Sequence, residues 1–270
     1  MQGSFRTIEL SDVEFESQGL RFLTVKTPNL KGRGDICLYV PQVDENISNL
    51  PIYILLHGVY GSAWIWALKG GAHKTAKRMM DAKTIKPAII AMPSDGLWGD
   101  GSAYFSHHQK NFDNWIVNDV ITAIKENIPQ AKNSTSICIG GLSMGGYGAL
   151  SLGARFPEKF KAISAHSALT KLEQMQLFVE EPIKEYNKEA KFPNVFDIIL
   201  KNKFTLPPLR FDCGKKDILI KHNRELNIKL IENGINHTYE EFNGKHEWPY
   251  WIKYLKRTLL FFDIHSLYNL

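Results

Sequence analysis

A serine between two glycines is the clearest chemical signal in the chain. Gly141-x-Ser143-x-Gly145 follows a short apolar run and precedes a segment of small residues, 146–154, that is predicted to be helical. A strand, a sharp turn and a helix are the setting that holds a serine hydroxyl out at the end of a strand. Glycines let that turn tighten without Cβ clashes. We therefore predict that Ser143 is a nucleophile; the alternative is a glycine-rich turn whose serine does no chemistry.

A serine hydroxyl needs a neighbouring base to attack a carbonyl at neutral pH. Among nine histidines, His246 directly follows the last predicted strand, so it is expected to emerge at the same sheet edge as Ser143. Asp217 follows the preceding predicted strand, and the chain order Ser143, Asp217, His246 is one of the known triad orders. Asp217 would hold the imidazole in its productive tautomer. Asp212, within a predicted strand, and Asp197 are weaker candidates for the acid.

Two backbone N–H groups are expected to bind the oxyanion that such an attack creates. One belongs to Met144, directly after the nucleophile, and the other to Val59, in the loop after an early apolar run. His57 precedes that loop, so we assign it a structural role as a hydrogen-bonding partner of the loop rather than the role of a second base.

Short apolar runs alternate with helix-period segments from residue 52 onward, which predicts a mostly parallel sheet flanked by helices. In such sheets ligands bind outside the carboxyl ends of the strands. Helices are predicted from a four-residue apolar repeat over 112–124 and from an apolar pattern at 226–231, which Gly234 would end. The six runs are residues 52–56, 88–92, 136–139, 162–165, 209–213 and 238–242.

Two segments depart from this rhythm. The first forty residues contain three candidate strands, 13–16, 22–26 and 36–40, which predict an antiparallel extension at the N-terminus. Residues 168–208 are long, mixed in charge and contain four prolines, so we interpret them as a cap-like insertion, with a plain surface connection as the alternative. Neither segment resembles a linker, and we predict one domain over residues 1–270.

Composition excludes several classes of protein. The 270 residues are 44% hydrophobic and 23% charged, which is typical of a folded globular chain rather than a disordered one. The net charge of +5 is spread along the sequence, which argues against a nucleic-acid groove. No apolar run approaches the roughly 20 residues of a membrane span. The first ten residues lack the apolar region of a secretory signal, so the chain as given is expected to be cytoplasmic, unless a signal has been removed.

Four motifs together carry a resemblance to a known family. They are Leu55-Leu56-His57-Gly58, Gly141-Leu142-Ser143-Met144-Gly145-Gly146, Cys213-Gly214-x-x-Asp217 and Gly244-x-His246-x-Trp248. The chain resembles the "putative esterase" branch of the α/β-hydrolases, which includes esterase D-like enzymes, feruloyl and acetyl-xylan esterases, and mycolyltransferases. The resemblance covers residues 22–262, although Lys245 and Glu247 stand where many relatives have glycine and aspartate. It implies an α/β-hydrolase fold and hydrolysis of carboxylic esters through an acyl-enzyme, with no cofactor and no metal.

Tryptophans suggest what the pocket holds. Trp64, Trp98 and Trp248 each follow a predicted strand, so we expect them to bind substrate at the catalytic edge; the alternative is that they pack helices onto the sheet. With the resemblance, this favours short-chain acyl or carbohydrate-linked esters, such as acetyl or feruloyl esters, as substrates. An acyltransferase with the same triad and a non-catalytic binding module on this fold are the alternatives. No nucleic-acid or membrane partner is expected.

Overall fold

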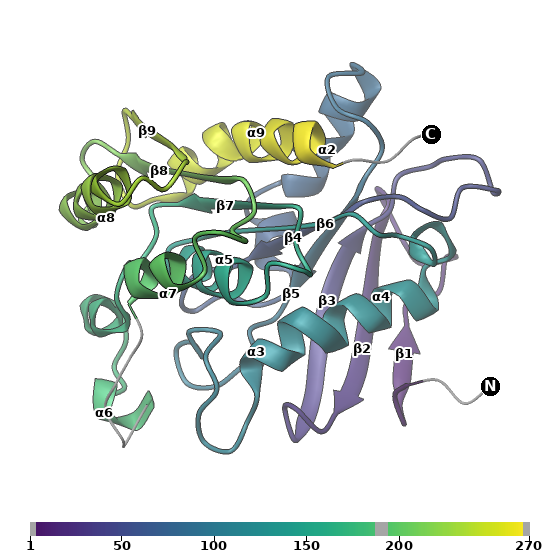
Figure 1. The fold of residues 1–270 in the computed structure, drawn as a ribbon. Helices are drawn as coiled ribbons and strands as arrows, with labels where there is room; N and C mark the ends of the chain where they lie inside the picture. Colours follow the sequence, from purple (N-terminus) through teal and green to yellow (C-terminus); the bar gives the residue numbers. More distant parts are fainter. Residues whose placement is uncertain (1–3, 187–193, 267–270) are drawn as a thin grey trace.

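Nine strands form one mixed sheet in the computed structural model, which describes residues 4–186 and 194–266 (Figure 1). The strand order is β1-β2-β3-β5-β4-β6-β7-β8-β9. The first three strands and β5 pair antiparallel, and every pair from β5 to β9 is parallel, which confirms the predicted α/β-hydrolase sheet with its antiparallel N-terminal part. The strands are β1 Ile8–Leu10, β2 Leu20–Thr27, β3 Gly32–Tyr39, β4 Ile52–Leu56, β5 Ile89–Pro93, β6 Ile137–Leu142, β7 Ala162–His166, β8 Leu209–Gly214 and β9 Thr238–Phe242.

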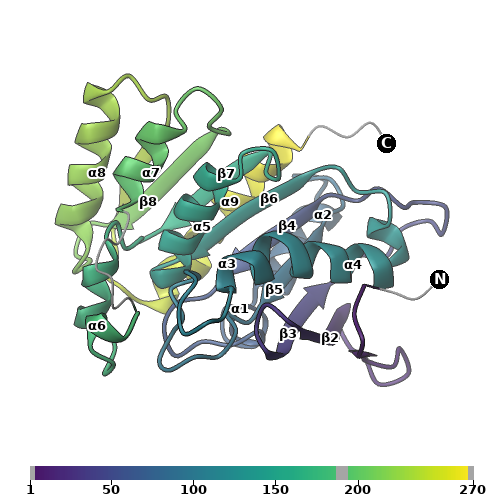
Figure 2. The same cartoon turned by 60° about the horizontal axis from the view of Figure 1, so that its bottom comes forward.

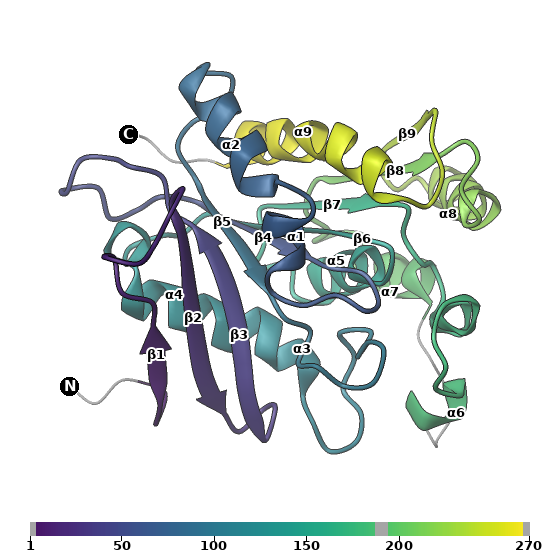
Figure 3. The ribbon, with the colours of Figure 1, turned by 180° about the vertical axis from the view of Figure 1, so that it is seen from behind.

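Helices cover both faces of the sheet. Helices α2 and α9 lie on one face, and α4 and α5 lie on the other, as Figures 2 and 3 show from two further sides. The α-helices are α1 Ile65–Leu68, α2 Ala72–Asp81, α3 Phe112–Asn114, α4 Ile121–Asn127, α5 Met144–Arg155, α6 Ile183–Tyr186, α7 Val195–Lys201, α8 Ile220–Glu232 and α9 Trp248–His265. Three further helical segments are the π-helix η1 Trp115–Val120 and the 3₁₀ helices η2 Pro129–Ala131 and η3 Leu172–Leu177.

The central strands contribute side chains to two separate hydrophobic cores, because successive side chains of a strand point to opposite faces of the sheet. In β4, Ile52 and Ile54 pack with the residues of α4 and α5, whereas Tyr53 packs with the residues of α2 and α9. Every residue of β4 to β8 is buried. This explains why these strands are recognised as uninterrupted apolar runs rather than as alternating patterns.

One predicted strand is wrong. Residues 13–15 form a turn and Glu16 lies in no strand, and the outermost strand is instead β1, which pairs with β2. The Asp12 carboxylate accepts the Glu14 N–H at 2.9 Å, and its carbonyl accepts the Phe15 N–H at 3.0 Å. This local capping competes with strand pairing. Val13 and Phe15 alternate in the sequence but are both largely exposed, so their apolar pattern marks no buried face.

The predicted helices are present, with one irregularity. The four-residue repeat over 112–124 corresponds to α3, η1 and α4 in succession, so the middle of this helical stretch has the wider π-helical turn. Gly234 follows α8 with a left-handed φ of 63°, as its predicted capping role requires. Among the described residues, no helix is both long enough and apolar enough to cross a membrane.

The predicted insertion, 168–208, contains η3, α6 and α7, with residues 187–193 outside the described part. Its first half reaches the sheet edge at which β6, β8 and β9 end. Glu180 N–H donates to the Asp100 carboxylate at 2.9 Å, and the Tyr186 hydroxyl donates to the Gly101 carbonyl at 2.9 Å. The insertion is therefore tied to the loop after β5.

Candidate active site

Ser143 occupies the turn between β6 and α5 in a strained backbone conformation, with φ of 53° and ψ of −118°. A Cβ at Gly141 would overlap the Gly145 carbonyl, and a Cβ at Gly145 would overlap the Leu56 carbonyl. Both glycines of the motif are therefore required by close backbone approach. The Ser143 N–H donates to the His166 carbonyl at 3.0 Å, which fixes the turn to β7.

The structure brings the three predicted side chains together from three loops. His246 Nε2 lies 2.9 Å from Ser143 Oγ, and His246 Nδ1 lies 3.0 Å from both carboxylate oxygens of Asp217. The Asp217 carboxylate also accepts the Leu219 N–H at 2.8 Å, which holds it in place. The Asp217 side chain is fully buried, whereas that of His246 is 15% exposed. A continuous hydrogen-bonded chain thus runs from a buried carboxylate to a serine hydroxyl.

The other two acid candidates lie elsewhere. Asp212 is inside β8, where it contacts a different histidine, and Asp197 is exposed at the start of α7, where its N–H is capped by Asn194 at 2.8 Å. Only Asp217, of these three aspartates, contacts His246.

A cleft of about 410 Å³ opens beside Ser143 and His246. Val59, predicted to donate to the oxyanion, lines this cleft, and Met144 begins α5 directly after Ser143. Within the described part of the chain, neither backbone N–H has a protein acceptor. The cleft is lined by Gly58, Val59, Tyr60, Ile65, Leu142, Ser143, Phe178, His246, Glu247, Trp248, Pro249 and Trp251.

His57 has the structural role predicted for it. Its Nδ1–H donates to the Gly58 carbonyl at 2.7 Å, and its Nε2 accepts the Asp95 N–H at 3.1 Å. Both ring nitrogens are therefore used inside the protein, where the residue is buried. These two bonds hold the loop that carries Val59 against the loop after β5.

The three predicted substrate-binding tryptophans differ in their position relative to the cleft. Trp248 lines the cleft, whereas Trp64 and Trp98 are outside its lining. Trp98 packs against His107 and Tyr186, with ring centroids 4.5 and 4.9 Å away. Trp98 therefore joins the insertion to the loops beside it.

Two further aromatic residues touch His246, and sequence reasoning missed one of them, Phe178. Phe178 stacks on the imidazole with ring centroids 5.0 Å apart, and Trp251 meets it edge-on at 5.1 Å. Trp251 follows His246 by five residues, in the first turns of α9, and its place after the last predicted strand already indicated the catalytic edge. Phe178 comes from the insertion, and only the expectation that this segment caps the site pointed to it.

No group of three or more metal-ligating side chains occurs within the described residues. The adjacent His107 and His108 have their Nδ1 atoms 2.9 Å apart and pack against Trp98. Burial lowers the pKa of His107 to about 4, so it is a neutral packing residue near pH 7.

Comparison with known proteins places the chain in a family. A family model described as "Putative esterase" matches residues 27–262. The chain belongs to this esterase family. It is therefore a carboxylic ester hydrolase, consistent with the site at the carboxyl ends of its strands.

Individual proteins are similar to the chain in sequence or in fold. The esterase is 28% identical to an acetyl esterase of Caldicellulosiruptor saccharolyticus over 79% of its own length and 84% of that protein. Its fold is similar to that of a ferulic acid esterase, with a TM-score of 0.80, 21% identity and coverage of 97% and 99% of the two chains. It is also similar to an S-formylglutathione hydrolase from Staphylococcus aureus, with a TM-score of 0.76, 16% identity and coverage of 94% and 99%. These two likenesses concern the fold.

Proposed function

We propose that this esterase is a serine enzyme that works through an acyl-enzyme. The observation that carries the proposal is the hydrogen-bonded chain from Asp217 through His246 to Ser143 at the wall of a cleft. His246 Nε2 takes the proton from Ser143 Oγ as the oxygen attacks the ester carbonyl, and then donates that proton to the leaving alcohol. In deacylation, His246 takes a proton from water while the water oxygen attacks the acyl carbon. The bond from that carbon to Ser143 Oγ then breaks, the acid is released, and Ser143 Oγ regains the proton.

Two features support stabilisation of the tetrahedral intermediates. Val59 lines the cleft and Met144 directly follows Ser143, and the unpaired N–H groups of both residues support the proposal that they bind the oxyanion. The buried Asp217 carboxylate lies against His246 Nδ1, where it stabilises the imidazolium that forms during proton transfer. We assign Ser143, His246 and Asp217 the roles of nucleophile, general base and orienting acid.

We further propose that the substrates are short-chain acyl or carbohydrate-linked esters, such as acetyl or feruloyl esters. A cleft of about 410 Å³ suits a small ester group. Its walls include Phe178, Trp248 and Trp251, and aromatic faces of this kind stack on sugar or phenyl rings. The 28% identity to an acetyl esterase supports the same class.

A chain-length series tests both the mechanism and the pocket. Hydrolysis of p-nitrophenyl esters from acetate to octanoate is measured for the wild type and for Ser143→Ala, which we expect to lose about 10⁴-fold or more of its kcat. Ser151→Ala is the matched control, because Ser151 is a buried serine two turns further along α5 and does not line the cleft. Full activity of Ser143→Ala would overturn the serine mechanism.

Covalent labelling and product analysis separate the alternatives. A fluorophosphonate is expected to label the wild type and Ser151→Ala but not Ser143→Ala. A folded wild type that neither hydrolyses any ester nor takes the label would instead favour a non-catalytic binding module. Transfer of the acyl group to an added alcohol, with little free acid formed, would show that the enzyme is an acyltransferase with the same triad.

A further inference from the structure

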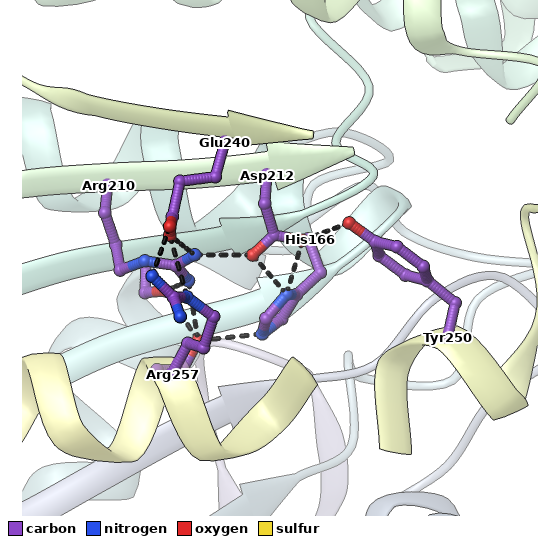
Figure 4. Close-up of polar contacts among 8 residues, drawn as sticks. His166, Arg210, Asp212, Glu240, Tyr250 and Arg257 are labelled. Atoms are coloured by element: carbon purple, nitrogen blue, oxygen red, sulfur yellow. Dashed lines mark hydrogen bonds and ion pairs between the residues drawn. The ribbon is translucent and has the colours of Figure 1, made fainter. Parts of the chain in front are cut away.

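A second histidine–aspartate pair lies buried between the sheet and α9 (Figure 4). His166, at the end of β7, lies with its Nδ1 2.9 Å from Asp212 Oδ2 in β8. The same carboxylate accepts the Arg210 guanidinium at 2.6 Å and the Tyr250 hydroxyl at 2.7 Å. His166 and Asp212 are at most 1% exposed. Three elements, β7, β8 and α9, thus meet at one carboxylate.

The polar side chains of this cluster hydrogen-bond to one another, so they are not available for chemistry. Arg210 donates to Ser164 Oγ at 3.0 Å and to Thr258 Oγ1 at 3.3 Å. The Ser164 hydroxyl can then donate to Thr258 Oγ1, 2.6 Å away, and the Thr258 hydroxyl to His166 Nε2, 2.7 Å away. His166 Nδ1–H is left to donate to Asp212. Each of these hydrogen bonds has one donor and one acceptor when His166 is neutral.

The charges balance in the same state. Arg210 and Arg257 face Asp212 and Glu240: Arg210 binds both carboxylates, and Arg257 binds Glu240 (Figure 4). Burial by itself raises the pKa of Asp212, but His166, Arg210 and the Tyr250 hydroxyl outweigh it and lower the pKa to about 2. The cluster is therefore an ionised, fully paired structural unit.

This cluster reaches all three loops that carry the proposed triad. The His166 carbonyl accepts the Ser143 N–H, and β8 runs from Asp212 toward Asp217. Tyr250 lies in the first turn of α9, four residues after His246, and its ring fills the space beside Gly244, at which a Cβ would overlap Tyr250 Cδ2. The Tyr250 ring is thus packed against the loop that presents His246.

Backbone bonds fix the other side of that loop. The Gly244 carbonyl accepts the Lys216 N–H at 3.0 Å, and the Phe242 carbonyl accepts the Lys215 N–H at 2.7 Å. The loop before His246 is therefore held to the loop of Asp217 on one side and to the Tyr250 ring on the other. The Tyr250 hydroxyl connects the Tyr250 ring to the buried Asp212 carboxylate.

We propose that Tyr250, anchored on Asp212, is a positioning residue that holds the His246 loop in register with Ser143 for catalysis. The inference rests on the proposed serine mechanism. Tyr250 is outside the cleft lining, so it acts through the loop rather than on the substrate. Loss of its anchor lets the imidazole move relative to the serine hydroxyl, and a misplacement of about 1 Å can cost roughly a hundredfold in rate.

Tyr250→Phe tests the proposal because it removes the hydroxyl and leaves the ring. At a temperature well below unfolding, kcat for p-nitrophenyl acetate is expected to fall about tenfold or more, with KM within about twofold of wild type. The rate of labelling by a fluorophosphonate is expected to fall by the same factor. Tyr254→Phe is the matched control: Tyr254 is one turn further along α9, and its hydroxyl makes no hydrogen bond to a described residue.

A second variant separates positioning from loss of stability. Thr258→Val removes the hydroxyl that closes the buried cluster at His166, two turns from Tyr250, and leaves the Tyr250–Asp212 bond intact. We expect Thr258→Val to lower the thermal midpoint at least as much as Tyr250→Phe, while its kcat stays within about twofold of wild type. Equal loss of kcat in both variants, or wild-type kcat in Tyr250→Phe, would overturn the proposal.

The two proposals fail in different ways. Wild-type activity in Ser143→Ala would remove the serine mechanism and the positioning role with it. If Ser143→Ala is inactive and Tyr250→Phe matches Tyr254→Phe in kcat and in labelling rate, the serine mechanism stands and the positioning role alone is wrong.

Discussion

Two histidine–aspartate pairs lie at neighbouring strand ends of this esterase, and their surroundings differ. In the cleft pair, His246–Asp217, and in the buried pair, His166–Asp212, an imidazole Nδ1 lies 3.0 Å from a carboxylate oxygen. The His246 side chain is 15% exposed and that of His166 is 1% exposed. Only His246 has a serine hydroxyl, that of Ser143, on its Nε2. The pair geometry alone therefore does not define a catalytic site.

The charge environment adds a second difference. The Asp212 carboxylate is already matched by the Arg210 guanidinium, whereas Asp217 accepts, besides His246, a neutral backbone N–H from Leu219. The charge of Asp217 is thus available to stabilise an imidazolium, while that of Asp212 is committed to its arginine. Under the proposed mechanism, the same pair serves catalysis in the cleft and stability in the interior, according to what else binds the carboxylate. Variants of each pair test this.

The largest effect is expected at the cleft pair. Asp217→Asn is predicted to lower kcat by about 10⁴-fold, because an amide does not stabilise the imidazolium and favours the wrong histidine tautomer. Steady-state hydrolysis of p-nitrophenyl acetate measures the loss, and circular dichroism checks the fold.

Asp197→Asn is the control for this variant, since Asp197 is an exposed aspartate of α7 that does not contact His246. It is expected to retain wild-type kcat. A loss of less than about tenfold in Asp217→Asn would remove the distinction between the two pairs.

The next effect is on stability at the buried pair. Asp212→Asn leaves the buried Arg210 without its main counterion, and breaking a buried ion pair in this way costs roughly 3–5 kcal/mol. Urea unfolding at pH 7 measures the free energy. Glu240→Gln is the comparison, because Glu240 is 21% exposed and its loss is expected to cost about 1 kcal/mol or less. Equal losses in the two variants would contradict the structural role of the buried carboxylate.

A smaller effect depends on pH. The pKa of Asp212 is lowered from 3.8 to about 2 in the folded protein, so its ionisation stabilises the fold above pH 4, and this stabilisation is lost as the pH falls through about 2. The stability advantage of wild type over Asp212→Asn is therefore expected to shrink by about 2 kcal/mol between pH 5 and pH 2. Urea unfolding of both proteins across this range tests it; an advantage that grows with acidity would be the wrong sign.

The central strands and the closeness of the three side chains of the proposed triad could be predicted from the sequence for a common reason. Buried parallel strands are apolar on both faces, so β4 to β8 stand out as short runs, and the residues after them must share one edge of the sheet. Ser143, Asp217 and His246 were found as the chemically suitable residues that follow β6, β8 and β9. Strand order places these three residues at one edge of the sheet.

The remaining parts depend on tertiary contacts that no local pattern encodes. Phe178 reaches His246 because the insertion folds back over the site, and its neighbours in the sequence do not indicate this. The buried pair left a weak signal: Arg210 and Asp212 are two residues apart, so they share one face of β8. His166 meets Asp212 because β7 and β8 pair in that register, and Tyr250 meets it through the packing of α9.

The smallest effect is expected at the wall of the cleft, which lies beside the His246–Asp217 pair. Trp248 lines the cleft, with Trp66 and Trp251 edge-on at 5.6 and 5.4 Å, whereas Trp98 packs against His107 outside it. Loss of one aromatic contact with a bound ring is worth about 0.5–1.5 kcal/mol, so Trp248→Leu is expected to raise KM for a feruloyl ester roughly two- to tenfold.

Trp98→Leu supplies the contrast and is expected to leave KM for the same ester unchanged. Parallel KM measurements on acetyl and feruloyl esters sharpen the comparison. The acetyl group is too small to stack on a ring, so KM for the acetyl ester should respond least to Trp248→Leu. If Trp98→Leu raised KM for the feruloyl ester as much as Trp248→Leu, the substrate would have to extend beyond the cleft toward the insertion. The aromatic cluster around Trp98 would then belong to the binding surface rather than to the packing of the loops.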